Sequence, residues 1–175
     1  MFLPKVSDIV VYGTNGVCEI TEIKEMEFLG KSSEYFVLKP IGDMKSTVFL
    51  PVDNDVLLKR VRPVLTSEEI YALIDTMPSE AENWIGNDTL RKKRYSEILS
   101  GGDRSEIIGI IKTLYLLRKK KEAAGKKLRI SDASFLKEAE KQLYSEFAYV
   151  LNIPFEEVVA FICQRLGISD TVEAE

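Results

Sequence analysis

The densest run of positive charge in this chain comes shortly after its only tryptophan. Trp84 lies in a polar segment rich in turn-forming residues, and the run consists of Arg91, Lys92, Lys93 and Arg94. An exposed aromatic ring can wedge into a distorted step of a duplex while neighbouring cations bind the phosphates on either side. These residue types in this order allow nucleic-acid binding in which Trp84 contacts bases and the cations contact the backbone.

Two simpler interpretations remain open. A lone tryptophan in a helical domain is more often part of the core because it buries a large apolar area, and a run of lysine and arginine is usually a solvated helix face. Turn and cap residues around Trp84 favour exposure instead, since they make the backbone irregular there. These residues are Glu82, Asn83, Gly86, Asn87 and Asp88.

Charge is distributed unevenly along the chain, although the net charge is only −4. Residues 65–89 hold six acids and no lysine or arginine, residues 90–130 hold thirteen bases and four acids, and residues 131–175 hold three bases and nine acids. The three segments therefore carry −6, +9 and −6. Cations concentrated on two successive helices form a positive surface that attracts phosphates.

The chain contains no histidine, which excludes Ser-His and Cys-His nucleophile pairs, histidine general bases and histidine-bearing zinc sites. No glycine-rich phosphate loop is present, and Gly101 and Gly102 indicate the end of a helix instead. Cys18 and Cys163 lie far apart in apolar patterns and are predicted to be buried, reduced thiols. We expect a binding protein with no enzymatic activity, cofactor, metal site or small-molecule substrate.

Composition and hydropathy also limit where the protein acts. Hydrophobic residues make up 45% of the chain and charged residues 30%, which is typical of a globular protein. No apolar run approaches the length needed to cross a bilayer or to form a signal peptide. We expect a cytoplasmic protein that does not bind membranes.

The first part of the chain is predicted to be a β domain. Residues 8–62 hold short runs rich in β-branched and aromatic residues, separated by turn signals. About five such strands predict a small, strongly bent antiparallel barrel of the SH3 or Tudor kind over residues 1–64. An exposed edge of this barrel would be a docking surface for a strand of another chain.

The run STVFLPV shows how one of these strands divides between core and surface. Alternation places Val48 and Leu50 on one face and Thr47 and Phe49 on the other, and Pro51 ends the ladder. If Val48 and Leu50 fill the core, then Phe49 lies outside, where it contacts a partner or packs under a loop.

After residue 64 the apolar period changes from two to 3.6, which predicts a bundle of about five helices over residues 65–168. An acidic tail over residues 169–175 follows. The predicted fold is therefore α+β with two domains. The expected helix starts are Thr66, Asn87 or Asp88, Asp103, Ser131 and Pro154, and Gly167 ends the last helix.

The second of these helices would contain the basic run. The expected inward residues are Leu90, Tyr95, Ile98 and Leu99, and residues 91–94 are expected to lie largely in solvent.

Several motifs follow one another in a distinctive order: KVSDIVVYGTNGVCEI, EYFVLKP, TVFLPVDN, VRPVL, NWI, RKKRYSEILSGGD and ISDASFLKEAEKQLYSEFAYVL. Together they resemble the CarD (CdnL) family of bacterial transcription regulators, whose first domain also occurs in the transcription-repair coupling factor. The resemblance extends over about residues 1–166. It implies a Tudor-like domain that binds the RNA polymerase β subunit and a helical domain that touches promoter DNA at the upstream edge of the minus-ten region.

The resemblance also implies a role for the tryptophan segment. Trp84 matches the family tryptophan that wedges into the minor groove at the edge of the opened bubble and stabilises the open complex. The basic helix that follows would supply Arg91, Lys92, Lys93 and Arg94 for the DNA backbone. Family DNA contacts at the start of a later helix are not clearly matched, since Ala133 and Ser134 occupy that region.

On the polymerase side, the resemblance points to the strands that carry Met26, Thr47, Phe49 and Pro51. Well-known family members have arginines at the places of Met26 and Phe49. Docking here would therefore depend on strand pairing and apolar contact.

A protein-interaction adaptor is the alternative interpretation. In that case the β domain docks a partner other than polymerase, the bundle is a structural spacer, and Trp84 is buried in the hinge between the domains.

Overall fold

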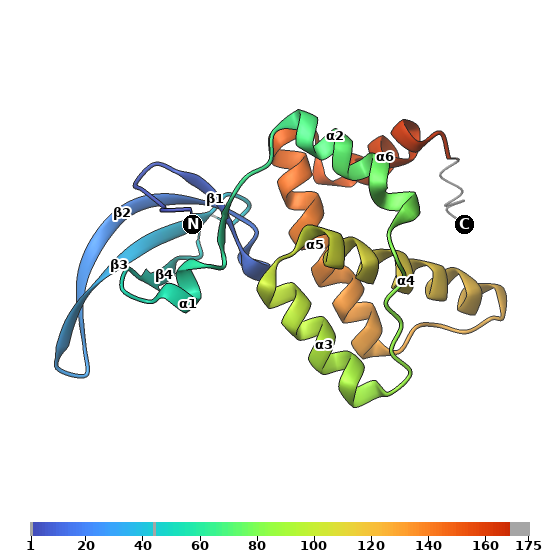
Figure 1. Cartoon of the computed structure of the whole chain (residues 1–175), viewed down its shortest axis with the longest axis horizontal. Helices are drawn as coiled ribbons and strands as arrows, with labels where there is room; N and C mark the ends of the chain where they lie inside the picture. The colour runs from blue at the N-terminus through green and yellow to red at the C-terminus, as the bar shows by residue number, and fades with distance from the viewer. Residues whose placement is uncertain (1, 44, 169–175) are drawn as a thin grey trace.

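The computed structural model describes residues 2–43 and 45–168, and the predicted acidic tail lies outside these residues. A curved antiparallel sheet and a bundle of helices lie side by side, and the chain passes once from the sheet to the bundle (Figure 1). The α+β fold with a β domain followed by a helical domain is confirmed.

The sheet has five strands in the order β4-β3-β2-β1-β5, so β4 and β5 form its edges. β2 and β3 form a long hairpin whose tip extends beyond β4, because β4 pairs only with Tyr35–Leu38 of β3 (Figure 1). A short helix follows β4, and its N-cap Asn54 accepts a hydrogen bond from the backbone N–H of Leu57 at 3.1 Å. The elements are β1 (Ile9–Tyr12), η1 (Gly13–Asn15), β2 (Val17–Phe28), β3 (Lys31–Pro40), β4 (Val48–Pro51), α1 (Asp55–Leu58) and β5 (Val61–Pro63).

The concave side of the sheet encloses a small apolar core. Leu50 is fully buried and Phe49 is exposed, so the two residues lie on opposite faces as the alternation in STVFLPV predicts, and the face of Leu50 is the core. Cys18 is buried as expected, and this burial raises the pKa of its thiol to about 11. Cys163 is only half-buried, so the prediction of a buried thiol is wrong at that position. The core residues are Val10, Cys18, Ile20, Phe36, Leu38, Leu50, Leu58 and Val61.

The helical part of the described chain contains five α-helices, as predicted, and two short 3₁₀ turns. Thr66 and Glu69 form the expected capping box, while Asn87 and Asp103 cap the next two helices. The prediction that the last helix starts at Pro154 is wrong in detail, because a 3₁₀ turn comes first. The elements are α2 (Ser67–Thr76), η2 (Met77–Ser79), α3 (Asp88–Gly101), α4 (Arg104–Ala123), α5 (Ile130–Leu151), η3 (Phe155–Glu157) and α6 (Val158–Leu166).

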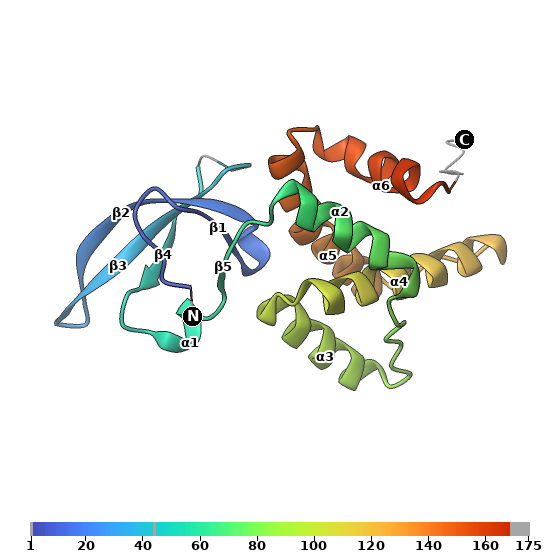
Figure 2. The same cartoon turned by 45° about the horizontal axis from the view of Figure 1, so that its top comes forward.

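One apolar core holds this bundle together. α4 packs across α5, α6 lies beside α2, and α3 contacts both α4 and α5 (Figures 1 and 2). Tyr95 packs edge-on against Phe135, with ring centroids 5.6 Å apart. The fully or nearly buried residues include Ile70, Ile74, Tyr95, Ile98, Leu99, Ile107, Ile110, Leu114, Leu143 and Phe147.

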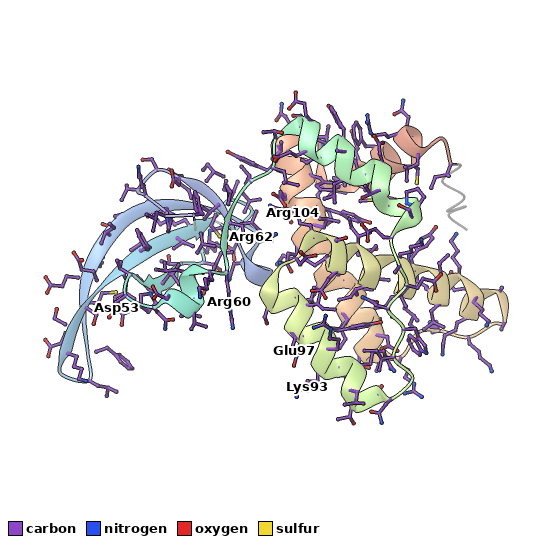
Figure 3. The ribbon with its side chains drawn as sticks, viewed as in Figure 1. Asp53, Arg60, Arg62, Lys93, Glu97 and Arg104 are labelled. Carbon is purple, nitrogen blue, oxygen red and sulfur yellow. The ribbon has the colours of Figure 1, made fainter. Side chains whose placement is uncertain are left out.

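A charged joint connects the sheet to the bundle. Glu146 of α5 is buried and accepts hydrogen bonds from Arg104 of α4 and from the backbone N–H of Leu65. Arg62 of β5 lies over Gly102, and Figure 3 shows Arg62 and Arg104 beside one another at this joint. Burial, and then the neighbouring Arg104, lower the pKa of Arg62 to about 10.

Candidate nucleic-acid and polymerase interfaces

Trp84 lies in the irregular segment between η2 and α3. This segment passes across α4 on the side of α3 that faces away from the sheet (Figure 1). Its side chain is 47% exposed and lies outside the apolar core of the bundle. The structure therefore agrees with the expected exposed indole. Trp84 lies away from the joint between the domains, so the alternative of a tryptophan buried in the hinge is wrong.

The segment that carries Trp84 is irregular but anchored. The backbone N–H of Asn83 donates to Oγ1 of Thr113 at 2.9 Å, and the Asn83 carbonyl accepts a 3.5 Å hydrogen bond from the Tyr95 hydroxyl. Nζ of Lys112 donates to the carbonyl of Glu80 in this segment and to that of Pro78 in η2, at 2.8 Å each. These contacts fix the backbone next to the indole, so its exposure does not come from a loose loop.

α4 approaches this segment closely at a glycine. A Cβ atom at Gly109 would lie 3.0 Å from Nδ2 of Asn83 and 3.1 Å from the carbonyl oxygen of Ala81. Most real Cβ contacts are longer than this, so the glycine at position 109 allows the segment to lie directly on α4.

The expectation that Arg91 lies in solvent is wrong. Arg91 is 1% exposed, whereas Leu90, which was expected to face inward, is 57% exposed. Nε of Arg91 donates to Oδ1 of Asp132 at 3.0 Å, and Nη2 donates to Asp88 at 2.7 Å. The guanidinium takes the inward position because these carboxylates compensate its charge there. Because Arg91 is buried and paired, the prediction that it contacts the DNA backbone is wrong.

Arg91 also contacts the tryptophan segment. Its Nη1 donates to the carbonyl of Ile85 at 2.9 Å, and its Cζ lies 4.3 Å from the centroid of the Trp84 ring. At this distance the guanidinium and the indole form a cation–π pair. One side of the exposed ring is thus covered by a buried cation.

The other three cations of the run point in different directions, because successive residues of an α-helix are about 100° apart. Lys92 forms an ion pair with Asp88 at 2.7 Å, and Arg94 pairs with Glu106 of α4. Lys93 is exposed on the outer side of α3 (Figure 3), and no ion pair of Lys93 is seen within residues 2–43 and 45–168. The run therefore surrounds one end of α3 and does not form a single stripe.

Sequence reasoning missed a cation at this site. Arg129, the residue before α5, is 65% exposed, and its Nη1 lies 3.3 Å from Oδ1 of Asp88. Asp88 thus joins Lys92 and Arg129, and the hydrogen bond from Lys92, with these neighbouring charges, lowers the pKa of Asp88. The start of α5 lies beside that of α3, which a sequence pattern alone does not reveal. Ala133 and Ser134 are exposed on the same end of α5.

A second group of cations surrounds the turn between α4 and α5. A hollow of about 590 Å³ lies there, and most of the side chains that line it are exposed or half-buried. Two acids, Glu122 and Glu140, share its lining with the cations. The cations are Arg118, Lys126, Lys127 and Lys137.

The residues expected to meet polymerase come together on one face of the sheet. Phe49 pairs with Val37 and Pro51 with Tyr35, while Met26 pairs with Ser33, two residues along β3 from Tyr35. Directly opposed residues share a face, as do residues two apart on one strand. Met26, Tyr35, Phe49 and Pro51 therefore form a continuous face on the convex side.

This face ends at an unpaired edge strand on one side and continues to apolar residues at the tip of the β2–β3 hairpin. β4 is an edge strand, and Thr47 is exposed immediately before it. Phe28 lies on the same face at the hairpin tip and is exposed, and the adjacent Leu29 is exposed with a positive φ of 53°. A leucine in this conformation is uncommon in a turn, where glycine or asparagine is favoured.

Two features expected of other protein classes are not found in the described part of the chain. No cluster of His, Cys, Asp and Glu within residues 2–43 and 45–168 could hold a metal ion. The same residues include no helix with the length and apolar character needed to traverse a bilayer.

Comparison with protein families matches both parts of the chain. The CarD-like/TRCF RID domain matches residues 5–64, and the CarD C-terminal domain matches residues 69–163. No curated protein shows significant similarity to the chain. The first match coincides with the sheet and the second with the bundle that carries Trp84, in the order that the motifs indicated. The chain therefore belongs to the CarD family of transcription regulators that interact with RNA polymerase.

Proposed function

We propose that this protein binds the RNA polymerase β subunit through its sheet and stabilises the open promoter complex through Trp84. The observation that carries this proposal is the half-exposed indole, held on an anchored segment with cations around it. A ring presented in this way loses little conformational freedom when it meets a base, so more of its stacking energy remains for binding.

On the DNA side, Trp84 would wedge at the upstream edge of the minus-ten region from the minor groove. Lys92, Lys93, Arg94 and Arg129 would contact the DNA phosphates near Trp84. The cations at the α4–α5 turn would contact phosphates further along the DNA. These contacts carry little sequence information, because phosphates are the same at every base pair. Binding to isolated duplex DNA should therefore be weak and strongly dependent on salt.

The effect on transcription initiation would come from differential binding. The indole favours the melted state only because it makes contacts there that the closed duplex lacks. A coupling of about 1–3 kcal/mol would shift the equilibrium roughly 5–150-fold toward the open complex. This mechanism is non-catalytic, and the chain's lack of histidine is consistent with it.

On the polymerase side, the convex face formed by Met26, Tyr35, Phe49 and Pro51 would bind the β subunit. The free edge of β4 can add a strand of the partner to the sheet, which provides backbone hydrogen bonds, and the apolar side chains provide specificity. Glu22 and Lys24 lie on the same face, opposite Val37 and Tyr35, so its contacts would combine the apolar Met26 and Phe49 with these two charges.

The substitution Trp84→Ala tests this function directly. Open-complex lifetime on a promoter fragment, measured after addition of a competitor, should fall by a factor within roughly 5–150. Polymerase binding by the variant should remain unchanged. Trp84→Phe is the matched control, since its ring retains stacking and should preserve most of the lifetime. An unchanged lifetime for a folded Trp84→Ala protein would refute the proposed role.

A further inference from the structure

We infer that Arg91 and Asp132 form a positioning pair that covers one face of the Trp84 ring, so that the indole stacks on a single base with its other face. This inference rests on the proposed function for its biological meaning. The arrangement itself can be tested in the free protein.

The stability of the bundle does not account for this pair. Both side chains are almost fully buried, and they join α3 to α5 at 3.0 Å. Replacing a buried ion pair by apolar residues of similar volume is often neutral or even stabilising. Besides its ion pair with Asp88 at the start of α3, Arg91 directs its remaining contacts at the tryptophan segment, which indicates what the pair does.

The hydrogen bonds of Arg91 determine how its guanidinium plane is oriented. Nε and Nη2 donate to the two carboxylate oxygens of Asp132, at 3.0 and 3.3 Å, while Nη1 donates to the Ile85 carbonyl. Guanidinium donors lie in the plane of the group, so these contacts occupy its edges. Its flat face is left for the indole, whose centroid is 4.3 Å from Cζ.

The backbone on both sides of Trp84 is held as well. The carbonyl of Asn83 accepts from the Tyr95 hydroxyl, and the carbonyl of Ile85 accepts from Arg91. The indole is therefore fixed by its two neighbours and by the cation beneath it.

This geometry limits what the ring can contact. A free indole could enter between two bases and stack on both, but a guanidinium on one face leaves room for only one base. The ligand is thus a single base at the boundary between duplex and melted DNA. Arg91 and Asp132 act through Trp84 and touch no DNA themselves.

Arg91→Lys is the first test, because lysine retains the charge but loses the planar fork. Trp84 is the only tryptophan, so acrylamide quenching of its fluorescence reports directly on the exposure of the ring. We expect greater quenching in Arg91→Lys and in Asp132→Asn. Open-complex lifetime should fall by roughly fivefold, the lower end of the range for such a coupling.

The chain provides a matched control at another site. Arg165 forms a bidentate ion pair with Asp75 at 2.8 Å and lies over the Tyr71 ring, with Cζ 4.6 Å from its centroid. Arg165→Lys removes the same kind of arrangement between α2 and α6. It should change neither the quenching of Trp84 nor the lifetime of the open complex.

A double-mutant cycle separates positioning from general destabilisation. In a Trp84→Ala background, Arg91→Lys should shorten the open-complex lifetime no further. A further loss comparable to that in the wild-type background would overturn the inference, as would unchanged quenching in a folded Arg91→Lys protein.

If Arg91→Lys does not fold, Asp132→Asn tests the inference by the same two measurements, the quenching of Trp84 and the open-complex lifetime. Failure of Trp84→Ala to alter lifetime would refute the proposed function, while quenching would still decide whether the pair covers the ring.

Discussion

Glu146 of α5 holds Arg104 of α4 through two hydrogen bonds, with Oε1 to Nη2 at 2.6 Å and Oε2 to Nε at 2.9 Å. The same carboxylate accepts the backbone N–H of Leu65, and Arg104 donates to the carbonyl of Pro63. The chain thus enters the bundle through a buried ion pair. We therefore expect this joint to help set the separation between the sheet and Trp84.

Glu146→Gln should therefore weaken the joint. Removing one charge of a largely buried ion pair leaves the other uncompensated, which costs about 2–4 kcal/mol of unfolding free energy here because Arg104 is partly exposed. Chemical denaturation would measure this loss. A more variable distance between labels on the sheet and the bundle should accompany it, whereas an unchanged distance distribution would show that other contacts set the orientation.

The proposed phosphate contacts predict a change in the salt dependence of DNA binding. Charge reversal at Lys92 or Arg129 should weaken DNA binding by a similar factor on every promoter sequence, because phosphate contacts are independent of sequence. Each lost contact should also reduce the slope of log K against log salt by about one. Lys31→Glu in the sheet hairpin is the control. A loss confined to particular promoters would contradict the assignment to the backbone.

Local sequence signals predicted much of the fold correctly. Cap residues such as Thr66, Asn87 and Asp103 mark helix starts because their side chains satisfy N–H groups that the helix leaves unpaired. Alternation placed Leu50 and Phe49 on opposite faces because successive side chains in a strand point to opposite faces, and the structure buries Leu50. Turn residues likewise predicted the exposure of Trp84.

The misassigned residues depend on contacts between distant parts of the chain. Leu90 and Arg91 exchange their expected places because Asp132 lies opposite Arg91, on a helix far along the sequence. Arg129 reaches the site for the same reason, since the ends of α3 and α5 meet only in the folded protein. A pattern of hydrophobicity assigns arginine to the surface and contains no information about such a partner.

Gly109→Ala should displace the tryptophan segment. The added Cβ would lie 3.1 Å from the Ala81 carbonyl, and this strain should cost about 1–3 kcal/mol of unfolding free energy. The fluorescence emission of Trp84 should shift at the same time. Gly101→Ala is the matched control, because nothing lies within 4 Å of the corresponding Cβ position. Equal stability and equal emission in the two variants would show that Gly109 does not support the segment.

The proposed polymerase-binding face of the sheet can be tested by substitution. Phe49→Ala should weaken binding to the polymerase β subunit by roughly tenfold, because a well-packed aromatic residue at an interface is often a hot spot. Phe28→Ala should produce a smaller loss if the hairpin tip extends the contact. Val56→Ala, at an exposed position of α1 outside this face, should leave affinity unchanged. Surface plasmon resonance with the full-length protein would compare the three variants.

Replacing Glu140 with an uncharged residue should increase the stability of the protein. Burial raises the pKa of its carboxyl, with Arg118 offsetting part of the effect. A carboxyl whose pKa is higher in the folded state than in the unfolded state penalises folding above the folded pKa, and the penalty disappears as the pH falls below the unfolded pKa. Glu140→Gln should therefore stabilise the protein at neutral pH and lose this advantage in acid. Thermal unfolding of the wild type and of Glu140→Gln across pH 3 to 8 would measure the difference in their stability. If the variant remains more stable at low pH by the same amount, packing rather than charge is responsible.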